Sequence, residues 1–216
     1  AVKLGPRSGW VRADMVTVAQ ACLQRSDITE DDLSERPANS KDDRFALPVS
    51  GRISQRYHSQ HRGLDMVADV GEALRAVARG ECIRLKRCPA CDENHRPNMF
   101  PCPGWMYRDP RWGFGYGNFV IMRHDYADLP KTMRKTMDRH KLQGGFAYVL
   151  YAHMSQVKVR LGEVVAADDL IGLTGHHGCS SAPHLHFEVK IGRDETVDGI
   201  WQKQIPVNPK LMFYMP

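Results

Sequence analysis

Two histidines at alternating positions of a β-type segment constrain the fold of this chain more than any other feature. The segment reads Pro-His-Leu-His-Phe-Glu-Val over residues 183–189. Side chains two residues apart on a strand point to the same face, so His184 and His186 project together while Leu185 and Phe187 face the core. Two imidazoles side by side are costly to bury unless they bind something. We therefore expect this strand to carry a ligand site, the simpler alternative being a pair of hydrogen-bonded surface histidines.

Two further segments offer side chains of the metal-binding kind. His61 and Asp65 stand four residues apart with Gly63 between them, so a turn that leads into a strand can direct both at one ion. His153 ends an apolar, strand-like segment. A catalytic zinc ion takes three nitrogen or carboxylate ligands and leaves its fourth position for water. Each segment alone is weak evidence, but together they supply three ligands and two spare histidines that can move protons or stabilise an oxyanion.

Short β-type segments separated by glycine follow from Phe45 onward. Strands are expected at 73–78, 81–86, 118–124, 146–152, 164–166, 170–173 and 184–191. Two segments interrupt this pattern. The first, 87–115, holds three cysteines and five prolines and should be an irregular excursion. The second, 128–141, is expected to be a helix capped by Asp128, with an early Pro130 and with Met133 and Met137 at four-residue spacing. Its basic residues form either a solvated face or a patch for an anionic polymer.

The first 44 residues have a different residue pattern from the rest of the chain. An amphipathic pattern predicts a helix over 14–25, and a capping pattern predicts a second short helix near Thr29. The stretch 36–43 is polar and rich in breakers, as linkers are. We therefore expect an N-terminal helical extension and linker at 1–44 and one main domain at 45–216.

Composition excludes some classes of function. No apolar run in the 216 residues approaches the roughly 18 residues that a membrane helix needs, so no membrane span is expected. The formal charge of +5 suits an anionic partner. However, the basic residues do not alternate with aromatic ones as in nucleic-acid binders, so nucleic acid is not expected. Residues 1–6 contain no apolar signal core, so an export signal is not visible.

The six cysteines allow two interpretations. Four of them are crowded between positions 82 and 102, which indicates either disulfides or a structural zinc site built from Cys82, Cys88, Cys91 and Cys102. Only one Cys-x-x-Cys pair is present, which favours disulfides. Six cysteines permit 15 full pairings, so no pairing is assigned.

Residues 45–213 resemble the lysostaphin/LytM-type zinc endopeptidases, which cleave peptide cross-links or bridges of peptidoglycan. The resemblance runs through ordered blocks and includes both the His-x-x-x-Asp and the His-x-His segments. These blocks are 47–51, 61–65, 71–80, 117–124, 151–155, 159–165, 171–175, 184–188 and 207–209. The order of so many blocks makes a chance match very improbable.

This resemblance implies a fold, a metal and a set of site residues. The fold would be mainly β, an antiparallel core of the lysostaphin/LytM, duplicated-hybrid-motif-like type, with the N-terminal extension and two insertions. His61, Asp65 and His186 would bind Zn²⁺. His153 and His184 would be the two active-site histidines that do not bind the metal, one helping to deprotonate the attacking water and the other binding the oxyanion. The sequence does not say which does which.

The implied function is that of a zinc metalloendopeptidase, a peptidoglycan hydrolase. Its partners would be peptidoglycan peptide stems, with an inhibitory or immunity protein as a further kind of partner. The enzyme would be a monomer, periplasmic or secreted, where disulfides are favoured. One alternative is a catalytically silent regulator of other wall hydrolases, which should lack ligands that are present here. Another is a cupin-like metal oxygenase, which would not explain His153 or the order of the blocks.

The chain departs from the family pattern in three places: the long segment 87–115, the helix at 128–141, and a less glycine-rich run at 176–182. All five site positions are intact, but the sequence does not determine the shape of the groove. Residues 1–44 either dock as a stabilising extension or cover part of that groove. His58 has the wrong spacing to serve as a ligand. His176 and His177 either line the groove or sit in a loop, and the others should be structural or exposed: His95, His124 and His140.

Overall fold

The computed structural model describes residues 2–4, 9–11, 47–91, 101–197 and 203–211. Contacts divide the chain into two units, Ala1–Lys41 and Asp42–Pro216. In the first unit, β1 (Val2–Leu4) pairs antiparallel with β2 (Gly9–Val11). The helices expected at 14–25 and near Thr29, and the linker at 36–43, lie outside the described residues. The boundary at 44 stays a prediction.

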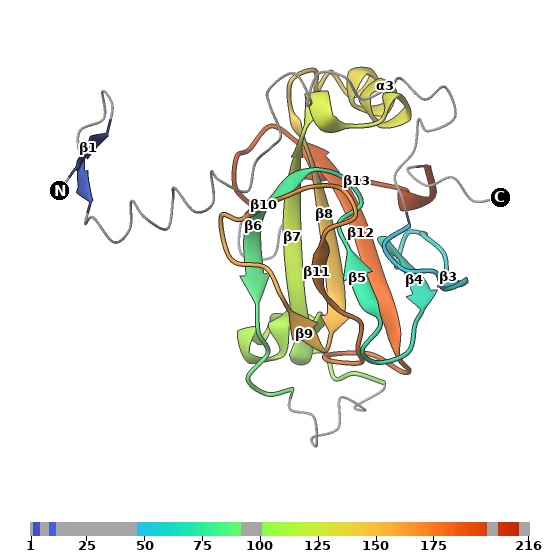
Figure 1. Ribbon diagram of the computed structural model, residues 1–216. Coiled ribbons are helices and arrows are strands. Elements are labelled where there is room, and N and C mark those ends of the chain that lie inside the picture. Colours follow the sequence, from blue (N-terminus) through green and yellow to red (C-terminus); the bar gives the residue numbers. More distant parts are fainter. Residues whose placement is uncertain (1, 5–8, 12–46, 92–100, 198–202, 212–216) are drawn as a thin grey trace. The chain divides into compact units, whose positions relative to one another are not determined.

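The second unit is built on one large antiparallel sheet (Figure 1). Its strands lie in the order β10-β6-β7-β8-β12-β4-β3, with β13 also paired to β12. A smaller sheet has the order β5-β11-β9. The strands of the large sheet are β3 (Ile53–Gln55), β4 (Gly63–Val67), β6 (Gly80–Lys86), β7 (Asn118–Asp125), β8 (Phe146–Met154), β10 (Val164–Val165), β12 (His184–Gly192) and β13 (Ile205–Val207). Those of the smaller sheet are β5 (Ala73–Arg75), β9 (Gln156–Val157) and β11 (Leu170–Leu173). The expected mainly antiparallel β fold is confirmed.

The central strand β8 explains how the sheet is covered on both faces. Its odd-numbered residues, such as Val149 and Tyr151, pack in the main core. Its even-numbered residues, such as Tyr148 and Leu150, pack in a second, smaller core. The neighbouring β12 follows the same alternation, because its odd-numbered residues 185–191 lie in the main core. Its even-numbered residues His184, His186, Glu188 and Lys190 therefore share the other face of the strand.

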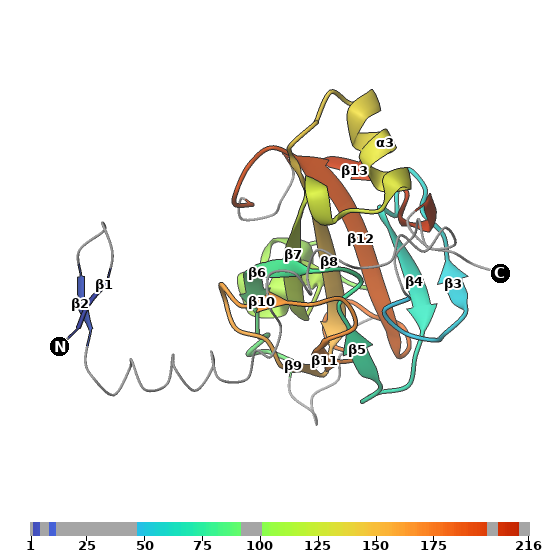
Figure 2. The ribbon, with the colours of Figure 1, turned by 45° about the horizontal axis from the view of Figure 1, so that its top comes forward.

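The expected helix is present as α3 (Lys131–Arg139), which joins β7 to β8, with Met133 and Met137 buried. The expectation that Asp128 caps it is wrong. Asp128 ends the 3₁₀ helix η3 (Tyr126–Asp128), where its carboxylate accepts a hydrogen bond from Arg79 at 2.9 Å, and Pro130 occupies the N-cap. Figure 1 and Figure 2 show α3 at one end of the large sheet. None of the described helices is long and apolar enough to cross a membrane.

The cysteines of the long insertion form disulfides. Cys88 is bonded to Cys91, and Cys102 to Cys179. The alternative four-thiolate zinc site is therefore wrong. Cys82 lies on β6 inside the main core as a free thiol, where burial raises its pKa to about 11, so it is a packing residue. The described part of the insertion includes two 3₁₀ helices, η1 (Met106–Arg108) and η2 (Pro110–Gly115).

Candidate metal centre

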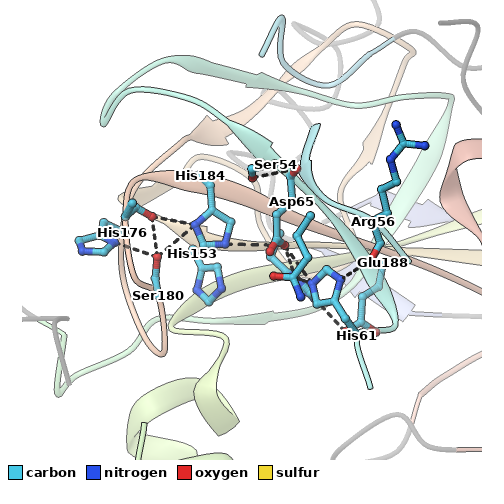
Figure 3. A network of polar contacts seen from close by, with 12 residues as sticks. Ser54, Arg56, His61, Asp65, His153, His176, Ser180, His184 and Glu188 are labelled. Carbon is cyan, nitrogen blue, oxygen red and sulfur yellow. Dashed lines mark hydrogen bonds and ion pairs between the residues drawn. The ribbon is translucent and has the colours of Figure 1, made fainter. Parts of the chain in front are cut away.

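Three side chains from separate parts of the chain meet where β4 and β12 pair. Asp65 on β4 lies directly opposite His186 on β12, and His61 comes from the bend just before β4. The Asp65 Oδ1 atom lies 2.7 Å from His186 Nδ1 and 3.1 Å from His61 Nε2. The two ring nitrogens are 3.2 Å apart. All three ligand atoms lie within 4.8 Å of one another, so these residues could hold a metal ion (Figure 3).

In His61 and His186, the outer ring nitrogen, which faces away from the cluster, has a partner of the kind that metal-ligating histidines have. His61 Nδ1 lies 3.1 Å from the carbonyl oxygen of Arg56, and His186 Nε2 lies 3.0 Å from Glu188 Oε1. Each ring can therefore donate its outer N–H to an oxygen, which leaves the nitrogen that faces the cluster for Asp65 or for a metal ion, as in metal-ligating histidines. Two nitrogens and one carboxylate are a donor set that zinc accepts.

The electrostatics of the cluster favour a positive charge at its centre. Burial opposes ionisation of Asp65, but hydrogen bonds from His186 and His61 hold the pKa of Asp65 below its usual value. Burial likewise disfavours a charged His186, but the hydrogen bonds to Asp65 and Glu188 raise the pKa of His186 to about 9. Two buried carboxylates that flank one imidazole thus create a site that a cation would neutralise.

His153 and His184 lie beside this cluster, with their ring centroids 4.7 Å apart. His153 Nδ1 lies 2.7 Å from the carbonyl oxygen of His177, and His184 Nδ1 lies 2.7 Å from that of Ala182. A carbonyl oxygen can only accept, so each Nδ1 carries a proton, and Nε2 is the nitrogen that this bond leaves unused. Burial, with the nearby His184 and His186, lowers the pKa of His153 well below its usual value. His153 is therefore held as a neutral base, and His184 is oriented by the same kind of hydrogen bond.

His153 has a strained backbone. Its φ angle is 61°, in the left-handed region that costs a residue with a side chain about 1–3 kcal/mol. The conformation is held by the bond from its N–H to the carbonyl oxygen of Tyr116 at 2.9 Å. It lets the end of β8 turn the imidazole toward the cluster, and strain of this kind gathers at functional sites.

The sequence pattern missed one pair of residues at this site. Glu188 is 4% exposed, and its Oε1 accepts hydrogen bonds from His186 and from the hydroxyl of Tyr116, the latter at 2.7 Å. The signal was present, because Glu188 stands two residues after His186 and so shares its face of β12. Tyr116 precedes β7 and has no local signal that points to β12.

A cavity of about 640 Å³ contains the site. All five expected site residues line it, so the structure brings together His61, Asp65, His153, His184 and His186. Their individual roles stay predictions. The insertion contributes Tyr107, Arg108 and Phe114 to another part of the lining.

The other histidines in the described part of the chain lie outside this lining. His58 forms a backbone bridge with His61 and does not join the described metal cluster. The loop after β11 carries His176, which lies 2.8 Å from Ser180 Oγ, and His177, which lies 2.7 Å from the Asn118 amide. His124 is buried and His140 exposed, while His95 is outside the described residues.

Comparisons with known proteins identify similar sequences and structures. Residues 101–209 match the family described as Peptidase family M23. Lysostaphin from Staphylococcus staphylolyticus is 47% identical over 145 residues, which are 67% of this chain and 20% of the relative. The peptidoglycan DD-endopeptidase ShyB from Vibrio cholerae is 23% identical over 164 residues, 76% of this chain and 26% of the relative. The chain thus spans about a quarter or less of these relatives. The crystal structure of a zinc containing peptidase from Vibrio cholerae has a TM-score of 0.48 and 18% identity, over 80% of this chain and 41% of that one.

Proposed function

This chain belongs to peptidase family M23, and we propose that it is a zinc-dependent endopeptidase that hydrolyses peptide cross-links or bridges of bacterial peptidoglycan. The observation that carries the proposal is the convergence of a three-residue ligand set and two oriented histidines in one cavity. Two relatives, a lysostaphin and a peptidoglycan DD-endopeptidase, support the substrate class by their names.

Each site residue has a role in this proposal. His61, Asp65 and His186 would hold the zinc ion. When bound, zinc supplies Lewis-acid chemistry, polarising a peptide carbonyl and lowering the pKa of a water molecule. His153 and His184 would face the reacting groups with Nε2, one accepting the proton of the attacking water and the other, once protonated at Nε2, donating a hydrogen bond to the developing oxyanion.

The protein would act in the periplasm or outside the cell. Two disulfides in the described part of the chain support this, because such bonds persist in oxidising compartments. The expected substrates, peptidoglycan peptide stems, are found in the same compartments.

Digestion of purified peptidoglycan tests the proposal. Wild type and His184→Ala are compared with zinc content measured on both, and mass spectrometry of the soluble products identifies the bond. Wild type should release peptide fragments, and the variant should retain zinc and lose activity, because His184 is not in the ligand set. His140→Ala is the matched control, since that histidine is exposed at the end of α3. Zinc-loaded wild type that leaves walls of both the direct and the glycine-bridged type intact would contradict the proposal.

A further inference from the structure

With a divalent metal ion bound, the cavity would carry a net positive charge. Four side chains with a formal charge line it: Arg62, Asp65, Arg108 and Glu188. Asp65 and Glu188 both hydrogen-bond to His186, so their two negative charges belong to the metal site. A divalent cation would balance both carboxylates, which leaves the two arginines as surplus positive charge.

Neither arginine is neutralised within the described part of the chain. Both side chains are exposed, and neither forms an ion pair there; the only side-chain contact of Arg62 described is the bond from Nη1 to the Tyr57 hydroxyl at 3.2 Å. Four other arginines are paired with carboxylates: Arg75 with Asp168, Arg79 with Asp128, Arg111 with Asp109 and Arg123 with Glu81. The guanidinium groups at the cavity are therefore available to a ligand.

Arg108 is positioned by a covalent link. It ends η1, whose Met106 is fully buried, and the chain just before η1 is joined by Cys102 to Cys179 in the loop that precedes β12. The Tyr107 hydroxyl lies 3.0 Å from the sulfur of Cys179. Because Cys179 itself lines the cavity, η1 and this loop form one joined wall of it. A cationic side chain on such a wall loses less entropy on binding than one on a free loop.

We infer that Arg62 and Arg108 form a subsite for a carboxylate of the substrate peptide. A guanidinium group matches a carboxylate with two parallel N–H···O bonds, and the planar fork gives the match its specificity. The inference rests on the proposed function, because the peptide must reach the metal centre through the same cavity. It names the substrate class: a cross-linked peptide with a free carboxylate close to the scissile bond, in preference to a bridge made of glycine alone.

A matched pair of substrates tests this subsite. One is a purified cross-linked peptide dimer with free carboxylates on its diamino acids, and the other is the same dimer with these groups converted to carboxamides. We expect zinc-loaded wild type to show a kcat/KM at least about tenfold higher on the free-carboxylate dimer, a typical effect of a hydrogen-bonded charge. Arg108→Gln and Arg62→Gln should each reduce the difference by raising KM for the free-carboxylate dimer alone. Arg108→Lys should retain more of the difference in kcat/KM between the two dimers than Arg108→Gln does. Arg160→Gln, at an exposed arginine outside this cavity, is the control.

Binding of the two dimers, measured by calorimetry, separates the subsite from the proposed function. Equal binding and equal turnover of both dimers by wild type would overturn the subsite and leave the peptidase proposal intact. Arginine variants that weaken both dimers alike would also overturn it. Tighter binding of the free-carboxylate dimer without hydrolysis of either dimer or of a pentaglycine peptide would support the subsite and contradict the peptidase proposal.

Discussion

Glu188 holds His186 from the side opposite Asp65, with its Oε1 atom 3.0 Å from His186 Nε2. The imidazole is thereby fixed with Nδ1 toward Asp65 at 2.7 Å. Tyr116 in turn donates a hydrogen bond from its hydroxyl group to Glu188. The candidate metal site is therefore supported by a largely buried chain of hydrogen bonds that reaches from β12 to the segment before β7.

Removing the charge of Glu188 should weaken metal binding. We expect Glu188→Gln to raise the Kd for zinc about 10- to 100-fold, the usual effect of losing an outer carboxylate partner of a ligating histidine. Competition with a chromogenic chelator measures this Kd directly, without any substrate. Tyr116→Phe should have a smaller effect of the same sign, and Glu163→Gln, at an exposed glutamate, should have none. An unchanged Kd for Glu188→Gln would show that the contact with His186 does not support the ligand.

Removing the metal should destabilise the protein. A ligand that binds only the folded state stabilises it by about 2.7 kcal/mol when its free concentration is 100 times its Kd. We therefore expect a chelator to abolish hydrolysis and lower the Tm, and added zinc to restore both. Asp65→Asn should lose most of the zinc-dependent shift in Tm because it removes the charged ligand. A Tm that does not respond to zinc would argue against a metal at these residues.

The alternation of apolar and polar residues explains why the strand that carries the site could be predicted from sequence. On β12, apolar residues in the main core alternate with polar ones, and His184 and His186 fall on the polar set. In contrast, β3 and β13 have only three residues each. β3 pairs with β4, and β13 pairs with β12. Strands that short show no periodicity of their own, since their pairing depends on neighbours distant in sequence.

Contacts between distant segments account for what the sequence did not predict. Cys102 and Cys179 are 77 residues apart, and nothing local identifies them as partners. The same holds for Tyr116 and Glu188, which meet only because β7 and β12 both pair with β8. Asp128 had the residue type of a helix cap, but an ion pair with Arg79 holds its carboxylate outside the helix.

The disulfide between Cys102 and Cys179 should matter more for stability than the one between Cys88 and Cys91. A cross-link that closes a long loop removes more entropy from the unfolded chain, and the two pairs have sequence separations of 77 and 3. We expect the double variant Cys102→Ser, Cys179→Ser to lose about 2–4 kcal/mol of unfolding free energy, and Cys88→Ser, Cys91→Ser to lose less. Urea denaturation measures both. Equal losses would contradict this account.

Acidification should destabilise the fold through His124. This side chain is fully buried on β7, and burial lowers its pKa from 6.5 to about 4, although the hydrogen bond to the Arg79 carbonyl opposes the shift. Between these two pH values the unfolded chain binds a proton that the folded chain does not, so stability is full above about pH 6.5 and falls as the pH drops toward 4. The size of the shift corresponds to about 3 kcal/mol.

The neutral variant His124→Gln isolates this effect. Glutamine does not titrate, and its amide can still donate to the Arg79 carbonyl. The difference in unfolding free energy between wild type and variant, measured by urea denaturation from pH 7.5 to 4, removes contributions that the two share, including the pH dependence of metal binding. We expect wild type to lose its advantage as the pH falls, because only wild type must keep a buried imidazole neutral. A difference that stays constant across this range would mean that His124 titrates alike in the folded and unfolded chains.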